Sequence, residues 1–296
     1  MVQDFVREAP SVELRVPGVP GTPPRAEGDG PLDPMTGIQP VERPRGATWT
    51  WPVYRTGDAQ DPPVIVMHEI SGMSPTYIGY CRALAARGFH VWMPHIVGPT
   101  PTAGTVRAAV RVCISREIDV LRSGRTSRVV APLRDLARHV SGLHGGGRVG
   151  VVGMCLTGGF ALAMATEPAV SGAVAAQPAL PFRPFVGRAL GLSPADAQAI
   201  GERLEDGEVA ILCTRFARDA LSPHQRCAAV QDLGPGVEID EIPAAGFSFL
   251  DHSVLTVAPG KYRDRQPQAA RLQESADRVT DFLRSRLGAV APNENG

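Results

Sequence analysis

A single cysteine stands where a predicted strand gives way to a predicted helix. The strand Arg148–Gly153 is short and apolar, Cys155 follows it closely, and the helix Thr157–Thr166 begins directly afterwards with small residues. A tight turn of this kind requires small flanking residues, and it carries the cysteine beyond the carboxyl edge of a sheet. Free N–H groups at a helix N-terminus favour a thiolate or an oxyanion. Cys155 is therefore a candidate nucleophile.

Two histidines follow this cysteine and are candidates for its general base. His224 comes after a proline at an apparent helix start, where we expect it to be exposed. His252 lies in an irregular stretch after the predicted strand Val237–Ile242, where a loop histidine can reach over the sheet edge. The positions favour His252.

An acidic residue is needed to orient the base. Asp219 lies just past the predicted strand Glu208–Thr214 and precedes a helix start, so it follows a neighbouring strand end. Asp251 is the competing candidate, but a residue adjacent to the histidine rarely bends back onto its imidazole. An ordinary loop or helix-capping role is the alternative for Asp219.

A second polar group ends the predicted strand Pro63–His68. Glu69 and the backbone N–H of Ile70 follow this strand directly, so they are expected at the same sheet edge as the cysteine. A loop N–H in this place is a usual oxyanion-hole donor, paired with the N–H after the nucleophile, here Leu156.

The elements that would position these residues alternate along the chain from residue 63. Strands are predicted at residues 63–68, 89–93, 148–153, 172–176, 208–214 and 237–242, and the first of them is a continuously apolar run typical of a buried parallel strand. Helical patterns occupy residues 75–87, 105–122, 126–143, 157–166, 194–204, 222–232 and 268–286. This alternation predicts an α/β fold with a mostly parallel central sheet and helices on both faces.

The front of the chain differs from this regular body. Residues 1–44 are rich in proline and glycine and are predicted to form an irregular N-terminal extension, with a short strand near Val12–Val16. Residues 45–290 are predicted to form one domain that opens with a strand at Thr48–Arg55. Residues 178–207 exceed the usual connection length and are interpreted as an insertion.

The composition excludes several classes of function. Of the 296 residues 43% are hydrophobic, which is enough for a core, and the 30 basic and 30 acidic residues cancel. Zero net charge argues against nucleic acid or an anionic membrane as the main partner. Five cysteines without a C-x-x-C pair argue against a disulfide scaffold or a zinc site. Without a signal-peptide pattern or a long apolar run, we expect a cytoplasmic protein with no membrane span.

The motifs resemble a known family. The run Gly153-Met-Cys-Leu-Thr157 resembles the G-x-S-x-G nucleophile elbow of α/β-hydrolases, with cysteine in place of serine and threonine in place of the last glycine. With Val64-Ile-Val-Met-His-Glu-Ile70, the runs 82–94 and 149–161, and the positions of Asp219 and His252, the sequence resembles the dienelactone hydrolase family over roughly residues 45–287.

The resemblance implies the α/β-hydrolase fold and the hydrolysis of a small-molecule carboxylic ester or lactone. It implies that Cys155 is the nucleophile, His252 the general base and Asp219 the residue that orients it. The reaction would pass through a thioester acyl-enzyme, without a metal or an organic cofactor. The resemblance also implies that Glu69 contacts the resting thiol and promotes its deprotonation once substrate binds. The N–H groups of Ile70 and Leu156 would form the oxyanion hole.

The substrate is less defined than the reaction. Family members that act on dienelactone hold its carboxylate with arginines, one of them four residues after the catalytic histidine, and this sequence has Thr256 there. Arg116 is a candidate for the other arginine, but its predicted helix carries further arginines at 107, 111 and 122, which also fits a solvated basic face.

Two other classes of function remain open from the sequence. A non-catalytic α/β-hydrolase scaffold could bind a small molecule or a protein partner. A thiol redox protein could use Cys155, provided that Cys81 or Cys213 came within disulfide reach of it.

Overall fold

The computed structural model describes residues 35–96, 126–179, 188–243, 251–257 and 266–288. The strands in these ranges are β1 (Gln39–Val41), β2 (Val53–Thr56), β3 (Pro63–Met67), β4 (His90–Pro94), β5 (Val149–Met154), β6 (Val170–Ala176), β7 (Ala210–Phe216) and β8 (Val237–Ile242). The helices are α1 (Pro75–Ala85), α3 (Val130–Leu143), α4 (Leu156–Met164), α5 (Pro194–Glu205), α6 (His224–Gln231) and α7 (Gln266–Leu287).

All these strands form a single sheet in the order β1-β2-β4-β3-β5-β6-β7-β8. Strands β4, β3, β5, β6, β7 and β8 run parallel to one another, whereas β1 and β2 form an antiparallel edge. The chain passes from β3 to β4 on one side and then to β5 on the other side of β3. Open α/β sheets bind ligands at the carboxyl ends of strands beside such a reversal, which directs attention to the ends of β3 and β5.

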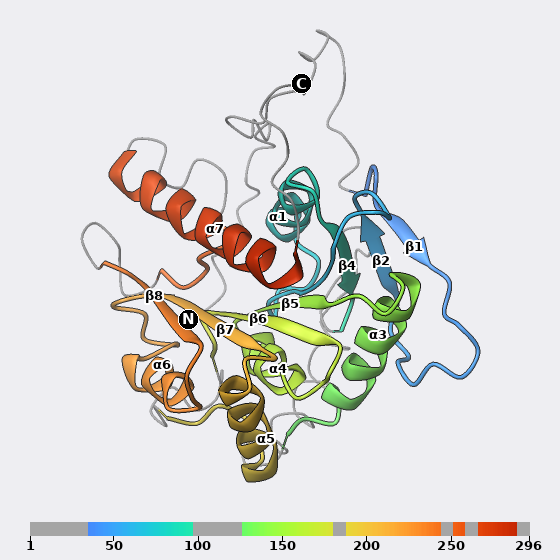
Figure 1. Cartoon of the computed structure of the whole chain (residues 1–296). Coiled ribbons are helices and arrows are strands. Elements are labelled where there is room, and N and C mark those ends of the chain that lie inside the picture. The colour runs from blue at the N-terminus through green and yellow to red at the C-terminus, as the bar shows by residue number, and fades with distance from the viewer. Residues whose placement is uncertain (1–34, 97–125, 180–187, 244–250, 258–265, 289–296) are drawn as a thin grey trace, which may run out of the picture.

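Helices cover both faces of this sheet (Figure 1). Helices α1 and α7 pack on one face, over a core that includes Tyr77 and Phe89, and helices α3 to α6 pack on the other, over a core that includes Leu136 and Phe160. The predicted fold class is thus confirmed, and the architecture is that of an α/β-hydrolase. Within the described ranges, every helix is too short or too polar to cross a bilayer.

The central strands follow from their apolar runs. Every residue of β3, β5, β6 and β7 is buried, because helices cover both sides of these strands. A strand buried on both faces carries no alternation of polar and apolar residues, so the continuous runs predicted its position within a few residues.

The N-terminal part differs from the prediction in two ways. Strand β1 lies inside the segment predicted to be irregular, and it pairs with β2 at the sheet edge. Strand β2 begins at Val53 rather than at Thr48, because the N–H and hydroxyl of Thr48 donate to the Asp135 carboxylate instead of to a neighbouring strand. The predicted strand near Val12–Val16 and the predicted helix 105–122 lie outside the described residues.

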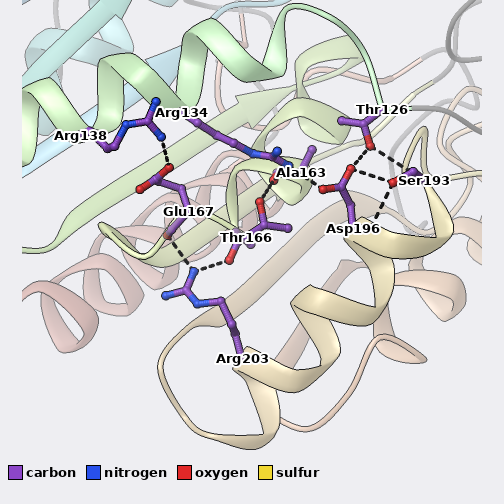
Figure 2. Close-up of polar contacts among 10 residues, drawn as sticks. Thr126, Arg134, Arg138, Ala163, Thr166, Glu167, Ser193, Asp196 and Arg203 are labelled. Atoms are coloured by element: carbon purple, nitrogen blue, oxygen red, sulfur yellow. Dashed lines mark hydrogen bonds and ion pairs between the residues drawn. The ribbon is translucent and has the colours of Figure 1, made fainter.

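The predicted insertion after β6 carries α5, which hydrogen bonds join to α3 and to the segment that follows α4 (Figure 2). The Asp196 carboxylate on α5 accepts from Arg134 of α3 at 2.8 Å and from Ser193 at 2.9 Å. Arg203 at the other end of α5 donates to the Glu167 carbonyl at 2.8 Å, and Arg138 pairs with the Glu167 carboxylate at 2.6 Å. These bonds explain why a long insertion remains packed beside the sheet.

The end of β5 approaches the start of α4 too closely for a side chain. A Cβ atom at Gly153 would lie 2.1 Å from the Thr157 carbonyl oxygen and 2.9 Å from the Ala161 Cβ. Cβ atoms in proteins essentially never make non-bonded contacts this short, so only glycine permits β5 to turn directly into α4.

We expect Gly153→Ala to lower the free energy of unfolding by about 1–3 kcal/mol, because the turn must open to admit the methyl group. Gly142→Ala is the matched control: a Cβ there meets nothing within 4 Å. This control should raise the stability by about 0.5–1 kcal/mol, as expected inside a helix. Urea unfolding followed by circular dichroism measures both, and a Gly153→Ala protein as stable as the wild type would contradict the steric account.

Candidate active site

Cys155 occupies a strained turn between β5 and α4. Its φ of 57° and ψ of −119° are rare for a residue with a side chain. Three backbone bonds hold this conformation: the Cys155 N–H donates to Ala176 at 3.0 Å, and its carbonyl accepts from Gly158 at 3.1 Å and Ala179 at 3.0 Å. The residue is 7% exposed. The turn thus fixes the sulfur at the carboxyl edge of the sheet.

Asp219 follows β7 and is almost completely buried. Its Oδ1 accepts the N–H groups of Leu221 at 2.8 Å and Ser222 at 3.1 Å, which folds the loop around the carboxylate. Its Oδ2 accepts a hydrogen bond from Nδ1 of His252 at 2.7 Å. The loop thereby holds the carboxylate with one oxygen committed to the backbone and the other directed at the imidazole.

His252 comes from the segment after β8, and its side chain is 15% exposed. Its Nε2 is buried and makes no hydrogen bond of regular geometry with the described residues. Burial by itself lowers the pKa of His252, but the hydrogen bond to Asp219 and the proximity of the Cys155 sulfur outweigh it and raise that pKa to about 10. At neutral pH the imidazole is therefore protonated, and its Nε2–H is available to a group beside Cys155.

Glu69 follows β3 and has two neutral partners. Its Oε1 accepts from the Gln177 amide at 2.9 Å and from the Thr256 hydroxyl at 2.9 Å. Gln177 follows β6 with an unusual φ of 36° and also accepts the N–H of Val254 at 3.3 Å. Thr256 thus positions Glu69. It occupies the place at which family members that act on dienelactone have an arginine. Contact between Glu69 and the Cys155 thiol stays a prediction.

The candidate oxyanion donors lie on the two sides of the β3–β5 junction. Leu156 is the first residue of α4, so its N–H has no acceptor within the helix. Ile70 follows Glu69 in the loop that leaves β3, and the neighbouring Gly72 N–H donates to the Glu69 carbonyl at 3.0 Å. Both backbone groups therefore lie at the strand edge that carries Cys155, as expected from the sequence.

The competing sequence candidates lie elsewhere. His224 is 75% exposed and lies 3.4 Å from Glu241, away from Asp219. The imidazole of His252 is hydrogen-bonded to Asp219, the acid that the sequence favours over the adjacent Asp251. The Cys213 sulfur lies 3.0 Å from the sulfur of Cys227 on α6. Its neighbouring thiol is therefore Cys227, whereas the redox alternative paired it with Cys155. Arg116 lies outside the described residues.

Buried arginines that the sequence did not single out support the Asp219 loop. Arg226 on α6 is 1% exposed and donates to the carbonyls of Leu221 and Pro178 at 2.8 and 3.2 Å. Arg215 on β7 is equally buried and donates to the Ser222 carbonyl at 2.6 Å. Arginines just after a predicted strand and within a predicted helix gave no signal of this role, since only the fold brings their guanidinium groups under the loop.

In the part of the chain that the structure describes, no group of three or more His, Cys, Asp or Glu side chains could hold a metal ion.

The sequence profile of the dienelactone hydrolase family matches residues 52–253, which span β2 through His252. The chain belongs to the dienelactone hydrolase family. This membership makes it a hydrolase. The match covers the strand ends that carry Glu69, Cys155, Asp219 and His252. None of the curated proteins searched matches the sequence.

Solved structures share the fold of this dienelactone hydrolase family member at low sequence identity. A proposed dienelactone hydrolase from Klebsiella pneumoniae is 19% identical, with a TM-score of 0.57 over 83% of this chain and 98% of that chain. A dienelactone hydrolase-like promiscuous phosphotriesterase from metagenomic libraries is 19% identical, with a TM-score of 0.54 over 83% and 98%. A dienelactone hydrolase from Anabaena variabilis is 14% identical, with a TM-score of 0.51 over 85% and 99%.

We expect Asp219→Asn to lower the pKa of His252 from about 10, because the amide removes both the charge and the acceptor that raise it. Histidine ring signals in two-dimensional NMR, followed against pH, measure the shift. His224→Gln serves as the control, because this exposed histidine lies away from Asp219 and its loss should leave the His252 titration unchanged. A His252 titration that is the same in Asp219→Asn and in the wild type would contradict the electrostatic account.

The raised pKa of His252 also predicts how stability depends on pH. A histidine with a higher pKa in the folded state than its ordinary 6.5 contributes stability below pH 6.5, and it loses that contribution as pH rises toward about 10. The difference in unfolding free energy between wild type and His252→Gln should therefore be larger at pH 6.5 than at pH 10. Urea unfolding at several pH values tests this, and a difference that grows with pH would reverse the assignment.

Proposed function

We propose that this protein hydrolyses carboxylic esters or lactones through a Cys155–His252–Asp219 triad. The observation that carries the proposal is the 2.7 Å hydrogen bond from His252 to the buried Asp219, together with a cysteine held in a strand-to-helix turn beside the same imidazole. A nucleophile, a base and an orienting acid drawn from three strand ends form the arrangement that acyl transfer requires.

In the first step Cys155 attacks the substrate carbonyl carbon as a thiolate, its proton having passed to Nε2 of His252, and the oxyanion is stabilised by the N–H groups of Ile70 and Leu156. The tetrahedral intermediate then breaks its bond to the ester oxygen. His252, protonated at rest, donates its Nε2 proton to this leaving oxygen. The products are an alcohol and a thioester on Cys155; with a lactone, the alcohol remains attached to the acyl chain.

In the second step the neutral His252 removes a proton from water, and the resulting hydroxide attacks the thioester carbonyl. The carbon–sulfur bond breaks and expels the Cys155 thiolate with the acid. His252 is again protonated and Asp219 again accepts its Nδ1–H, so the site returns to its resting state. The sum is one ester and one water converted to an acid and an alcohol.

Neutral substrates suit the residues beside Glu69. Its described partners, Gln177 and Thr256, are both uncharged amide and hydroxyl donors. Thr256 is occupied by Glu69 and carries no cation that could pair with a substrate carboxylate. We therefore propose an uncharged ester or lactone as the substrate class.

Rapid mixing with p-nitrophenyl acetate tests the reaction. The wild type should release a burst of p-nitrophenol that matches the enzyme concentration, because this activated ester acylates Cys155 faster than the resulting thioester is hydrolysed. Cys155→Ala should lose the burst and at least about 10³-fold in kcat, since the nucleophile is removed. Cys81→Ala removes a buried thiol on α1 and should keep both. A Cys155→Ala protein with wild-type turnover would reject the triad, and a wild type without a burst would favour a binding scaffold.

A further inference from the structure

The two proposed oxyanion donors belong to separate segments, so something must fix their relative positions. Ile70 lies in the loop after β3, and Leu156 lies in the turn after β5. The ladder between these strands pairs Met67 with Gly153 as its last register. Beyond it β5 turns away into the Cys155 elbow and offers β3 no further strand partner.

A threonine hydroxyl continues the connection beyond the end of the ladder. The Oγ1 atom of Thr157 accepts the Met154 N–H at 2.8 Å and lies 3.1 Å from each of the carbonyls of Met67 and His68. It lies 3.0 Å from the Met154 carbonyl as well, so its single proton is shared among acceptors on both strands. Thr157 is 1% exposed, so these groups are shielded from the solvent around the protein.

An imidazole, together with the Gly72 N–H that donates to the same carbonyl at 3.0 Å, orients the peptide that carries the Ile70 N–H. The Nδ1 of His68 lies 2.7 Å from the Glu69 carbonyl, and its Nε2 lies 3.1 Å from the Ile96 N–H. A carbonyl only accepts and an N–H only donates, so Nδ1 carries the proton and Nε2 does not. The Glu69 carbonyl and the Ile70 N–H are the two ends of one planar peptide group. Fixing the carbonyl therefore fixes the direction of the N–H.

The surroundings of His68 keep this tautomer neutral. The residue is fully buried, and burial lowers the pKa of its imidazole to about 4. The Tyr77 ring packs against it edge-on, with 5.7 Å between ring centroids. At neutral pH the ring can therefore accept from Ile96 and donate to Glu69 at the same time.

We propose that Thr157 and His68 are positioning residues of the oxyanion hole, an inference that rests on the proposed ester or lactone hydrolysis. The Thr157 hydroxyl holds the Cys155 elbow, with the Leu156 N–H, against the end of β3. The His68 imidazole then turns the Glu69–Ile70 peptide so that its N–H faces the same point. Neither side chain is required to touch substrate.

Paired variants separate positioning from folding. Thr157→Ser keeps the hydroxyl, whereas Thr157→Val keeps the shape and removes it. An asparagine amide nitrogen can occupy the place of Nδ1, so His68→Asn keeps the donor to Glu69, whereas the longer amide of His68→Gln reaches the place of Nε2 and keeps the acceptor for Ile96. Thr280→Val is the control for loss of a buried hydroxyl, since Thr280 donates to Ala276 on α7, on the opposite side of the sheet from α4.

The measurement is kcat per active site, with sites counted by the p-nitrophenol burst, so that unfolded protein is not scored. Thr157→Val and His68→Gln should lose about 10-fold or more in kcat per site with KM changed by less than about 3-fold, because the oxyanion donors act mainly in the transition state. Thr157→Ser, His68→Asn and Thr280→Val should stay within about 3-fold of the wild type. A trifluoromethyl ketone, which forms an oxyanion on Cys155, should bind more weakly to the first two variants by the same factor as their loss in kcat/KM.

Two results would overturn the inference: unchanged kcat per site in Thr157→Val, or equal losses in the two His68 variants. Both leave the burst intact, so they are distinct from failure of the proposed function, in which the wild type shows no burst or Cys155→Ala keeps its turnover.

Discussion

The turn from β5 into α4 is the constraint on which the site depends. It places Cys155 in a backbone conformation that costs on the order of 1–3 kcal/mol for a residue with a Cβ. The surrounding bonds to Ala176, Gly158 and Ala179 hold it there, and the bare Gly153 allows the close approach. Because the sulfur stands at the end of a buried strand, every other functional group must come from neighbouring strand ends.

Burial and charge act in opposite directions on the imidazole beside this turn. Desolvation lowers the pKa of His252, whereas Asp219 and Cys155 raise it by a larger amount. The Asp219 loop is held by Arg215 and Arg226, whose guanidinium groups bond the loop carbonyls. These two guanidinium groups thus hold the loop that carries a carboxylate nearly inaccessible to water. The acid–base behaviour of the site is a property of this buried layer as a whole.

This chain shares its fold with the family, but some side chains at the strand ends differ from the family pattern. Solved structures with 14–19% identity keep the same fold across more than four-fifths of this chain, which leaves side chains free to change. In this chain Thr157 stands where the elbow pattern has a glycine, and its hydroxyl bridges two strands. Thr256 likewise bonds Glu69. The threonine that departs from the elbow pattern is thus hydrogen-bonded to both β5 and the end of β3.

The sequence by itself determined the fold class, the succession of the central strands and helices along the chain, and the residues that would follow the strand ends. It did so because a strand buried on both faces must be continuously apolar, and because a strand-to-helix turn requires glycine. It also pointed to His252 and Asp219 from their places after successive strands. It missed β1, whose short, exposed segment carries no such pattern.

Only the tertiary structure decided the pairings. The hydrogen bond between His252 and Asp219, the raised pKa of His252, and the contacts of Thr157, His68, Gln177 and Arg226 all depend on which atoms meet across strands. Those contacts join residues up to 187 positions apart, as between Thr256 and Glu69. Hydrogen bonds and burial are set by distances in three dimensions, and residue types along a chain do not contain those distances.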